Sequence, residues 1–118
     1  MKGLIIRSPW IENILSGKKT WEIRGQSTNI RGEIWLIRSG SGTILGSVEL
    51  IDCMELDFET YKKAFRHHGI NSAEIEALPY KKTYAWVLKN PVTFVEPIKY
   101  HHPNGAIIWV DLKKGTTL

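Results

Sequence analysis

The chain has 118 residues, of which 42% are hydrophobic and 24% charged, which suits one globular domain and argues against a disordered chain. No apolar run approaches the ~20 residues that a membrane-spanning helix requires, and the opening residues do not read as a signal peptide. A single cysteine, Cys53, excludes an internal disulfide and fits a reducing compartment, so the sequence predicts a cytoplasmic protein.

The basic excess of the chain lies in its first third. Residues 1–38 hold seven Lys and Arg against three acidic residues, whereas residues 39–118 hold nine of each kind. The net charge of +4 is therefore confined to residues 1–38, which favours an anionic partner there. A charge of this size is also common on proteins that bind no nucleic acid, so it is a weak indicator by itself.

The opening residues predict a strand followed by a short helix. Residues 3–7, "GLIIR", form a short apolar run of the kind that makes a buried strand. Ser8 suits the N-cap of a helix and Pro9 its first position, so we expect a helix over residues 9–15. Gly17 stands where a left-handed C-cap would end this helix.

After the first helix the hydrophobic period changes to that of a strand. In "TWEIR", residues 20–24, Trp21 and Ile23 share one face, and polar side chains alternate with them on the other. We expect further strands over residues 33–38 and 43–53. Gly46 predicts a bulge or a sharp bend in the second of these strands.

The middle of the chain predicts a helical insertion near residues 57–78. Asp57 is a candidate N-cap for its first helix, and Gly69 a candidate stop. A second short helix is expected to open at Asn71 or Ser72 and to end before Pro79.

Strands return after the insertion, over residues 83–89, 92–98 and 106–112, and residues 113–118 are expected to be a disordered tail. About six or seven short strands in so short a chain predict a small closed barrel, since closure removes exposed strand edges. We therefore expect an α+β fold, mainly β, that forms one domain over residues 1–112.

The polar face of residues 18–24 is the best candidate for chemistry, because it gathers Lys18, Lys19, Glu22 and Arg24. An arginine offers a planar fork of donors that suits a phosphate or a base edge, and a carboxylate accepts the amine of a base. The alternative is that Glu22 and Arg24 form a solvated surface pair, worth ~0–1 kcal/mol. The spacing alone leaves both interpretations open.

Three further regions are candidates for a binding site. Asn29 and Arg31 lie in a polar loop, "STNIRG", that is alternatively a generic turn. Tyr84 and Trp86 alternate on one strand face and are either core anchors or a platform on which bases stack. His102 lies in the loop before the last strand, where it could hydrogen-bond a ligand. The histidine pairs are adjacent rather than spaced as metal ligands, so we expect no metal site.

Together these segments resemble the ASCH domain. The resemblance spans residues 1–112 and rests on "SPWIENILSGKKTWEIRG", "TNIRGEIWLI", "ILGSVELID", "YAWVL" and "PIKYHHPNGAIIWV". Its most specific part is a GxKTxExR core, whose charged positions are Lys19, Glu22 and Arg24 here, and Arg31 matches the "IRG" that follows. The resemblance implies a PUA-like β-barrel with a polar, basic cleft beside it, covered by the first helix and the loop over residues 25–32.

The resemblance also implies a function, since members of this family are thought to bind RNA or nucleotides. We therefore expect a module that binds RNA, a nucleotide or a modified nucleoside, without a cofactor. One alternative is a ribonuclease or nucleoside hydrolase in which Lys19 and Glu22 act as acid and base, with room for a divalent ion. One branch of the family deacetylates acetylcytidine with a threonine at the position of Glu22, so that reaction is not expected. A third alternative is a protein-interaction domain.

Overall fold

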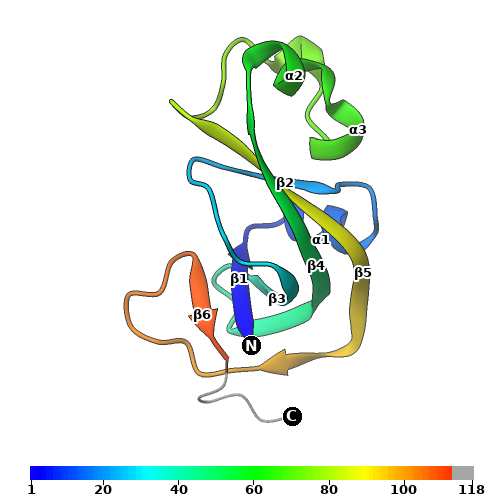
Figure 1. Ribbon diagram of the computed structural model, residues 1–118. Helices are drawn as coiled ribbons and strands as arrows, with labels where there is room; N and C mark the ends of the chain where they lie inside the picture. Colours follow the sequence, from blue (N-terminus) through cyan, green and yellow to red (C-terminus); the bar gives the residue numbers. More distant parts are fainter. Residues whose placement is uncertain (113–118) are drawn as a thin grey trace.

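The computed structural model describes residues 1–112, and the predicted disordered tail, residues 113–118, lies outside them. Six strands, three α-helical segments and one 3₁₀ turn follow one another along the described chain (Figure 1). In order they are β1 (Lys2–Ile6), α1 (Trp10–Leu15), β2 (Trp21–Arg24), β3 (Gly32–Arg38), β4 (Thr43–Leu56), α2 (Phe58–Lys63), α3 (Phe65–His68), η1 (Ser72–Glu74), β5 (Thr83–Lys99) and β6 (Trp109–Asp111).

The strands form one curled sheet in the order β2-β5-β4-β3-β1-β6. β1 runs parallel to β3, and the other neighbouring pairs are antiparallel. This confirms a mainly β, barrel-like fold with a short N-terminal helix and a helical insertion. It differs from a closed barrel in one respect, since within residues 1–112 no pairing joins the edge strands β2 and β6. β2 therefore keeps a free edge.

The longest strands differ from their predicted bounds. The two strands expected over residues 83–89 and 92–98 are one continuous strand, β5, because the chain bends at Asn90 without leaving the sheet. Asn90 has a φ of 54°, a left-handed conformation that asparagine tolerates better than most residues. The bend predicted at Gly46 is confirmed: the pairing register shifts there, and a Cβ on Gly46 would overlap the carbonyl oxygen of Val92.

The helical segments are shorter than the sequence indicates. The first helix begins one residue late, with Pro9 at the N-cap, because the hydroxyl of Ser8 donates to the Glu12 carboxylate at 2.8 Å instead of capping the backbone. Asp57 does cap α2, accepting from the Thr60 amide at 2.8 Å. The helix expected to open near Asn71 is a single 3₁₀ turn.

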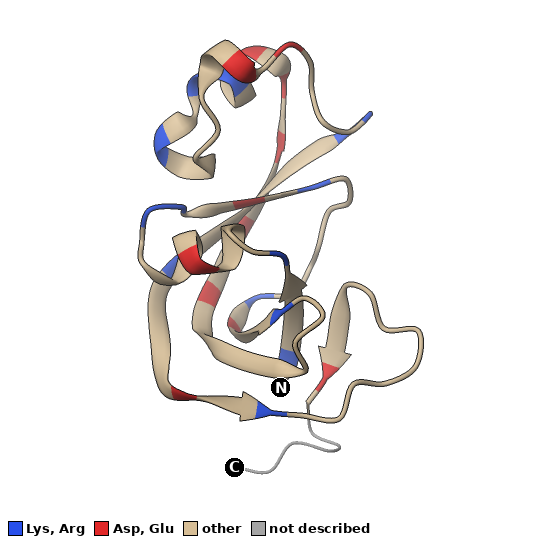
Figure 2. Cartoon of the chain, turned by 180° about the vertical axis from the view of Figure 1, so that it is seen from behind, with Lys and Arg blue, Asp and Glu red and all other residues tan. Residues whose placement is uncertain are grey.

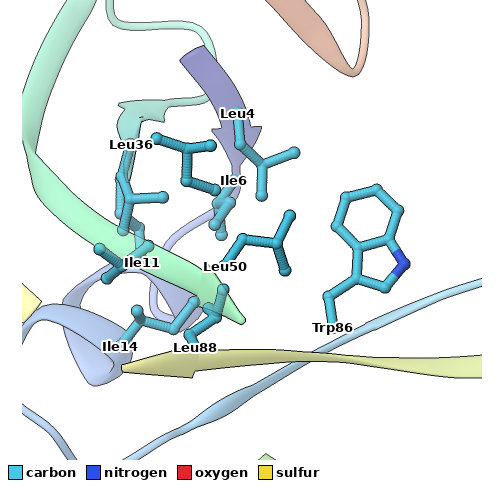
Figure 3. Packing of buried hydrophobic residues seen from close by; sticks show 10 residues of the cluster. Leu4, Ile6, Ile11, Ile14, Leu36, Leu50, Trp86 and Leu88 are labelled. Atoms are coloured by element: carbon cyan, nitrogen blue, oxygen red, sulfur yellow. The ribbon is translucent and has the colours of Figure 1, made fainter. Parts of the chain in front are cut away.

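Hydrophobic side chains cover both faces of the sheet where β2 pairs with β5. The main core lies between the sheet and α1 (Figure 3), and it consists of Leu4, Ile6, Ile11, Ile14, Ile34, Leu36, Val48, Leu50, Trp86 and Leu88. A second core lies between the sheet and the helical insertion, and it consists of Trp21, Leu56, Tyr61, Ala64, Ile75 and Ala85. β2 is thus an edge strand in which Trp21 and Glu22 are buried and Ile23 and Arg24 are partly buried.

No helix among the described residues is long and apolar enough to cross a membrane.

Candidate functional site

A cleft of about 350 Å³ opens between the free edge of β2, the end of β1 and the helical insertion. Its polar walls come from Arg7, Lys19, Glu22 and Arg24. Its remaining walls come from Ile5, Trp10, Ile23, Ser39, Tyr61, Ile70, Pro79, Tyr80 and Ile107. The volume falls within the roughly 300–1,000 Å³ of small-molecule sites in proteins. This cleft is the candidate functional site.

Strand pairing explains why charged side chains reach the cleft. Glu22 pairs with Trp86 and Arg24 with Tyr84 across β2 and β5, so these four side chains leave the same face of the sheet. Trp21 and Ile23 leave the opposite face, toward the insertion. The alternation in "TWEIR" therefore places the apolar and the charged side chains on opposite faces of β2.

Glu22 is the centre of the polar cluster. One of its oxygens, Oε2, accepts from Arg24 Nε at 2.9 Å and lies 2.8 Å from Arg24 Nη2, while the other, Oε1, lies 3.8 Å from Lys19 Nζ. The Glu22 side chain is only 10% exposed. Two cations thus share one nearly buried carboxylate, which leaves the cleft with a net positive charge, and Arg7 adds a further cation at its wall.

Lys19 is held as a buried cation at the floor of the cleft. Its residue exposure is 4%, and its Nζ donates to the carbonyl oxygen of His68 at 3.3 Å. The same nitrogen lies 5.1 Å from the ring centroid of Trp10, a cation–π distance. Burial lowers the pKa of Lys19, and the attraction of Glu22 opposes part of that shift.

Arg24 links β2 to β1, a strand with which β2 is not paired in the sheet. Its Nη2 donates to the carbonyl oxygen of Ile5 at 2.9 Å, and its guanidinium lies 5.6 Å from the ring centroid of Trp86. Basic side chains thus reach the cleft from three segments: the end of β1, the turn before β2, and β2 itself. Figure 2 shows these basic segments on both sides of α1 and along β2.

The helical insertion is fixed over β2 by two adjacent histidines. His67 stacks on Trp21 with ring centroids 4.4 Å apart, and its Nδ1 lies 3.0 Å from the hydroxyl of Thr20. His68 is fully buried, where its Nδ1 accepts from the Ile70 amide at 3.0 Å. Its Nε2 is bonded to the carbonyl oxygen of Tyr61, which makes Nε2 the protonated nitrogen. These contacts set the wall of the cleft that faces β2.

Comparisons with known proteins show the family and the fold of the chain. The family model described as the ASCH domain matches residues 4–98. The chain belongs to the ASCH domain family. Among solved structures, the crystal structure of ASCH from Zymomonas mobilis matches with a TM-score of 0.61 and 20% identity, covering 82% of this chain and 69% of that chain. The crystal structure of a serine-to-alanine mutant of that protein matches with a TM-score of 0.68 and 18% identity, covering 96% and 88%. No curated protein sequence matches the chain.

The ASCH core motif and the cleft coincide. Lys19, Glu22 and Arg24 meet there, as the sequence analysis expected, and they are bonded to one another. The cover of the cleft differs from the expectation: α1 contributes Trp10, but the loop over residues 25–32 does not line it, and the helical insertion stands in that place.

Other predicted residues of this ASCH domain lie away from the cleft. Lys18 is exposed beside a separate groove that it shares with Arg66. Asn29 is exposed, and Arg31 donates to two carbonyl oxygens of its own loop, Thr28 at 2.9 Å and Ile30 at 2.8 Å. The role of these residues in binding stays a prediction.

The predicted aromatic and histidine positions also have other partners. Trp86 is 2% exposed within the main core, and Tyr84 packs partly buried against it, so the core interpretation of this pair fits their burial. Nδ1 of His102 lies 2.7 Å from the Tyr100 hydroxyl, and its Nε2 lies 2.9 Å from the Ala106 carbonyl oxygen. His102 is not among the residues that line the cleft. Within residues 1–112, no cluster of histidine, cysteine, aspartate and glutamate is placed to hold a metal ion.

Sequence reasoning missed Arg7, Trp10 and Tyr80 as cleft residues of this ASCH domain. Trp10 has the spacing of a helix core residue, and Arg7 only ends a strand, so neither carries a local signal. Tyr80 follows a proline in a segment without periodicity. The glycine at position 25 is related to the place of Tyr80, because a Cβ on Gly25 would lie 2.8 Å from the Tyr80 ring. That contact pairs residues far apart in the chain, which one sequence cannot show.

His68 makes the stability of this ASCH domain depend on pH. Burial lowers the pKa of His68 below its ordinary value near 6.5. The hydrogen bond to Tyr61 raises this pKa, and the charges of Lys19 and His67 lower it further. The unfolded chain then binds more protons, so the His68 contribution is fully present above about pH 6.5 and is lost as the pH falls below that value. Each unit of pKa difference is worth about 1.4 kcal/mol.

The measurement is the free energy of unfolding in urea at pH 7.5 and pH 5.0. His68→Gln is the test variant, since a glutamine can donate to Tyr61 and accept from Ile70 without titrating. We expect this variant to lose part of the pH dependence, and the exposed His101→Gln to keep it. Equal pH dependence in the His68→Gln variant and the wild type would contradict the assignment.

Proposed function

We propose that this ASCH domain binds RNA or a nucleotide in the cleft beside β2. The observation that supports the proposal is the convergence of Arg7, Lys19 and Arg24 on one pocket of ligand size, where Glu22 is the only carboxylate among the described walls. A pocket with this excess of cations favours an anion, and the chemistry of arginine and lysine suits phosphate oxygens. Membership of the ASCH family agrees with the proposal.

The parts of a nucleotide have matching groups in the cleft. Arg7 is exposed and can reach a phosphate without losing another partner. Glu22 Oε1 has only the long contact to Lys19, so it can accept the exocyclic amine of a base. Trp10 and Tyr80 supply aromatic surface against which a base can pack. They replace Trp86 and Tyr84, whose rings are used by the core.

A second candidate function is hydrolysis of RNA or of a nucleoside, and one observation favours it. Lys19 is a buried lysine whose pKa is lowered, next to a carboxylate, in a cleft. Perturbed titratable groups gather at catalytic sites, and a lowered pKa makes a lysine a better proton donor. In this case Lys19 and Glu22 would act as acid and base on a ligand held by Arg7 and Arg24.

One experiment tests both candidates. Thermal unfolding of the wild type is followed with a panel of common and modified nucleosides, nucleotides and short RNA oligonucleotides, and each sample is then analysed for products. A ligand at 100 times its dissociation constant should raise the free energy of unfolding by about 2.7 kcal/mol. Stabilisation by an unchanged ligand supports binding, and consumption of the ligand supports catalysis. The absence of any stabilisation by nucleosides, nucleotides and RNA contradicts the proposal and leaves the protein-interaction alternative.

A further inference from the structure

A second hollow of about 390 Å³ adjoins the cleft, and we call it the aromatic hollow. It is lined by Arg24, Gly25, Gln26, Ser27, Tyr80, Trp86, Ile108 and Trp109. Two of these residues, Arg24 and Tyr80, also line the cleft. The two hollows therefore meet at Arg24 and Tyr80, and one extended ligand can occupy both.

The aromatic walls of this hollow are held in place by contacts with one another and with the backbone of residues 25–26. Trp109 stacks on Trp86 with ring centroids 5.6 Å apart and planes 12° apart. The indole N–H of Trp86 donates to the carbonyl oxygen of Gln26 at 2.9 Å. The ring of Tyr80 packs on the backbone of Gly25 and remains 45% exposed. Rigid aromatic surface that is open to solvent suits the face of a nucleobase.

Arg24 lies between the hollows with part of its guanidinium unused. Nε and Nη2 are bonded to Glu22 and to the Ile5 carbonyl oxygen, but Nη1 has no hydrogen-bond partner among the described residues. The Arg24 side chain is 19% exposed and lines both hollows, and the bonds of Nε and Nη2 fix the direction of its guanidinium. A phosphate between the hollows would satisfy it with a charge-assisted hydrogen bond.

We propose that the ligand is single-stranded RNA read as a unit of two consecutive nucleotides. One base occupies the cleft, the next base packs in the aromatic hollow against Trp109 and Tyr80, and Arg24 Nη1 binds the phosphate that links them. This inference rests on the proposed function and extends it from a nucleotide to a dinucleotide. It gives Trp109 a role in binding that its position in the last strand does not indicate.

The test compares the affinities of the four ribonucleoside monophosphates with those of the sixteen ribodinucleoside monophosphates, measured by calorimetry or fluorescence. Stacking of a base on an aromatic side chain is worth about 1–3 kcal/mol, or roughly 5- to 150-fold in affinity. We expect the best dinucleotide to bind at least about 10-fold more tightly than either of its component mononucleotides.

Two variants test whether the second base binds in the aromatic hollow. Ser27→Ile fills the aromatic hollow from an exposed loop position, and Trp109→Leu removes its aromatic wall. We expect both to bind the dinucleotide no more tightly than the mononucleotide, with mononucleotide affinity unchanged. Thr93→Ile, on an exposed site of β5 outside both hollows, is the matched control and should retain the full difference. Ser27→Ile alone decides the test if Trp109→Leu fails to fold.

The outcomes separate this inference from the proposed function. Mononucleotide binding without tighter dinucleotide binding overturns the inference and leaves the proposed function intact. A tighter dinucleotide whose advantage survives Ser27→Ile also overturns it, because the second base then lies elsewhere. If neither mononucleotides, dinucleotides nor longer RNA bind, the proposed function fails and the inference fails with it.

Discussion

Replacing Glu22 by alanine is expected to lower the free energy of unfolding by about 3–5 kcal/mol, because removal of one partner leaves buried charges without compensation. Lys19 is 4% exposed and the Arg24 side chain 19%, so neither cation can turn to solvent without breaking its other contacts. Those contacts are the His68 carbonyl oxygen for Lys19 and the Ile5 carbonyl oxygen for Arg24. The loss would be measured by urea unfolding at pH 7.5.

The chain contains a matched control for this substitution. Glu59 pairs with Lys63 at 3.7 Å, but their side chains are 71% and 79% exposed. Exposed pairs of this kind are worth about 0–1 kcal/mol, so Glu59→Ala should change stability little. Adding Lys19→Met to Glu22→Ala should recover part of the loss, since it removes one of the two uncompensated cations. A loss for Glu22→Ala no greater than that for Glu59→Ala would show that the cluster is solvated and that no polar cleft exists.

Replacing Arg24 by methionine is expected to weaken the binding of any nucleotide found for this protein by about 100-fold. Hydrogen bonds to charged groups are worth about 1.5–3 kcal/mol each, and Arg24 offers its free Nη1 together with the charge of the whole guanidinium. Methionine keeps an unbranched apolar stem and removes the guanidinium, which is the part of Arg24 that lies over the Trp86 ring. The measurement is the dissociation constant of the best nucleotide, with the unfolding temperature of each variant as a check on folding.

Lys99→Met is the control for the loss of one positive charge. Lys99 is exposed at the far end of β5 and lines neither hollow. We expect Lys99→Met to bind within about twofold of the wild type, and we expect Arg24→Met to reduce the slope of log affinity against log salt by about 1. Equal losses in the two variants would mean that the protein attracts nucleotides by its net charge and that Arg24 makes no specific contact.

The sequence predicts the elements that carry the cleft but not how they enclose it. The alternation in residues 20–24 correctly separates Trp21 and Ile23 from Glu22 and Arg24, because a strand places successive side chains on opposite faces. It does not show whether the polar face meets solvent or a pocket. That depends on the insertion, which contacts β2 through His67 some 47 residues later in the chain.

The same limit explains why the sequence left the role of Trp86 and Tyr84 open and gave no sign of Tyr80. Trp86 and Tyr84 share a face with the charged residues of β2, yet the main core reaches that face first and uses them. Tyr80 enters the site only because Gly25 leaves space for its ring. Such contacts depend on the path of the chain in three dimensions, and no local pattern of apolar and polar residues encodes them.

The central claim is that a nucleotide binds in the cleft beside β2. The most direct measurement is an NMR titration of the isotope-labelled protein with the nucleotide that stabilises it most. We expect the largest chemical-shift changes at the cleft residues Arg7, Lys19, Glu22, Arg24 and Tyr80, including the side-chain Nε–H of Arg24. We expect little chemical-shift change at Val95 and Lys99, at the far end of β5. Saturable shift changes confined to residues outside the cleft, or none with any nucleotide or RNA, would contradict the claim.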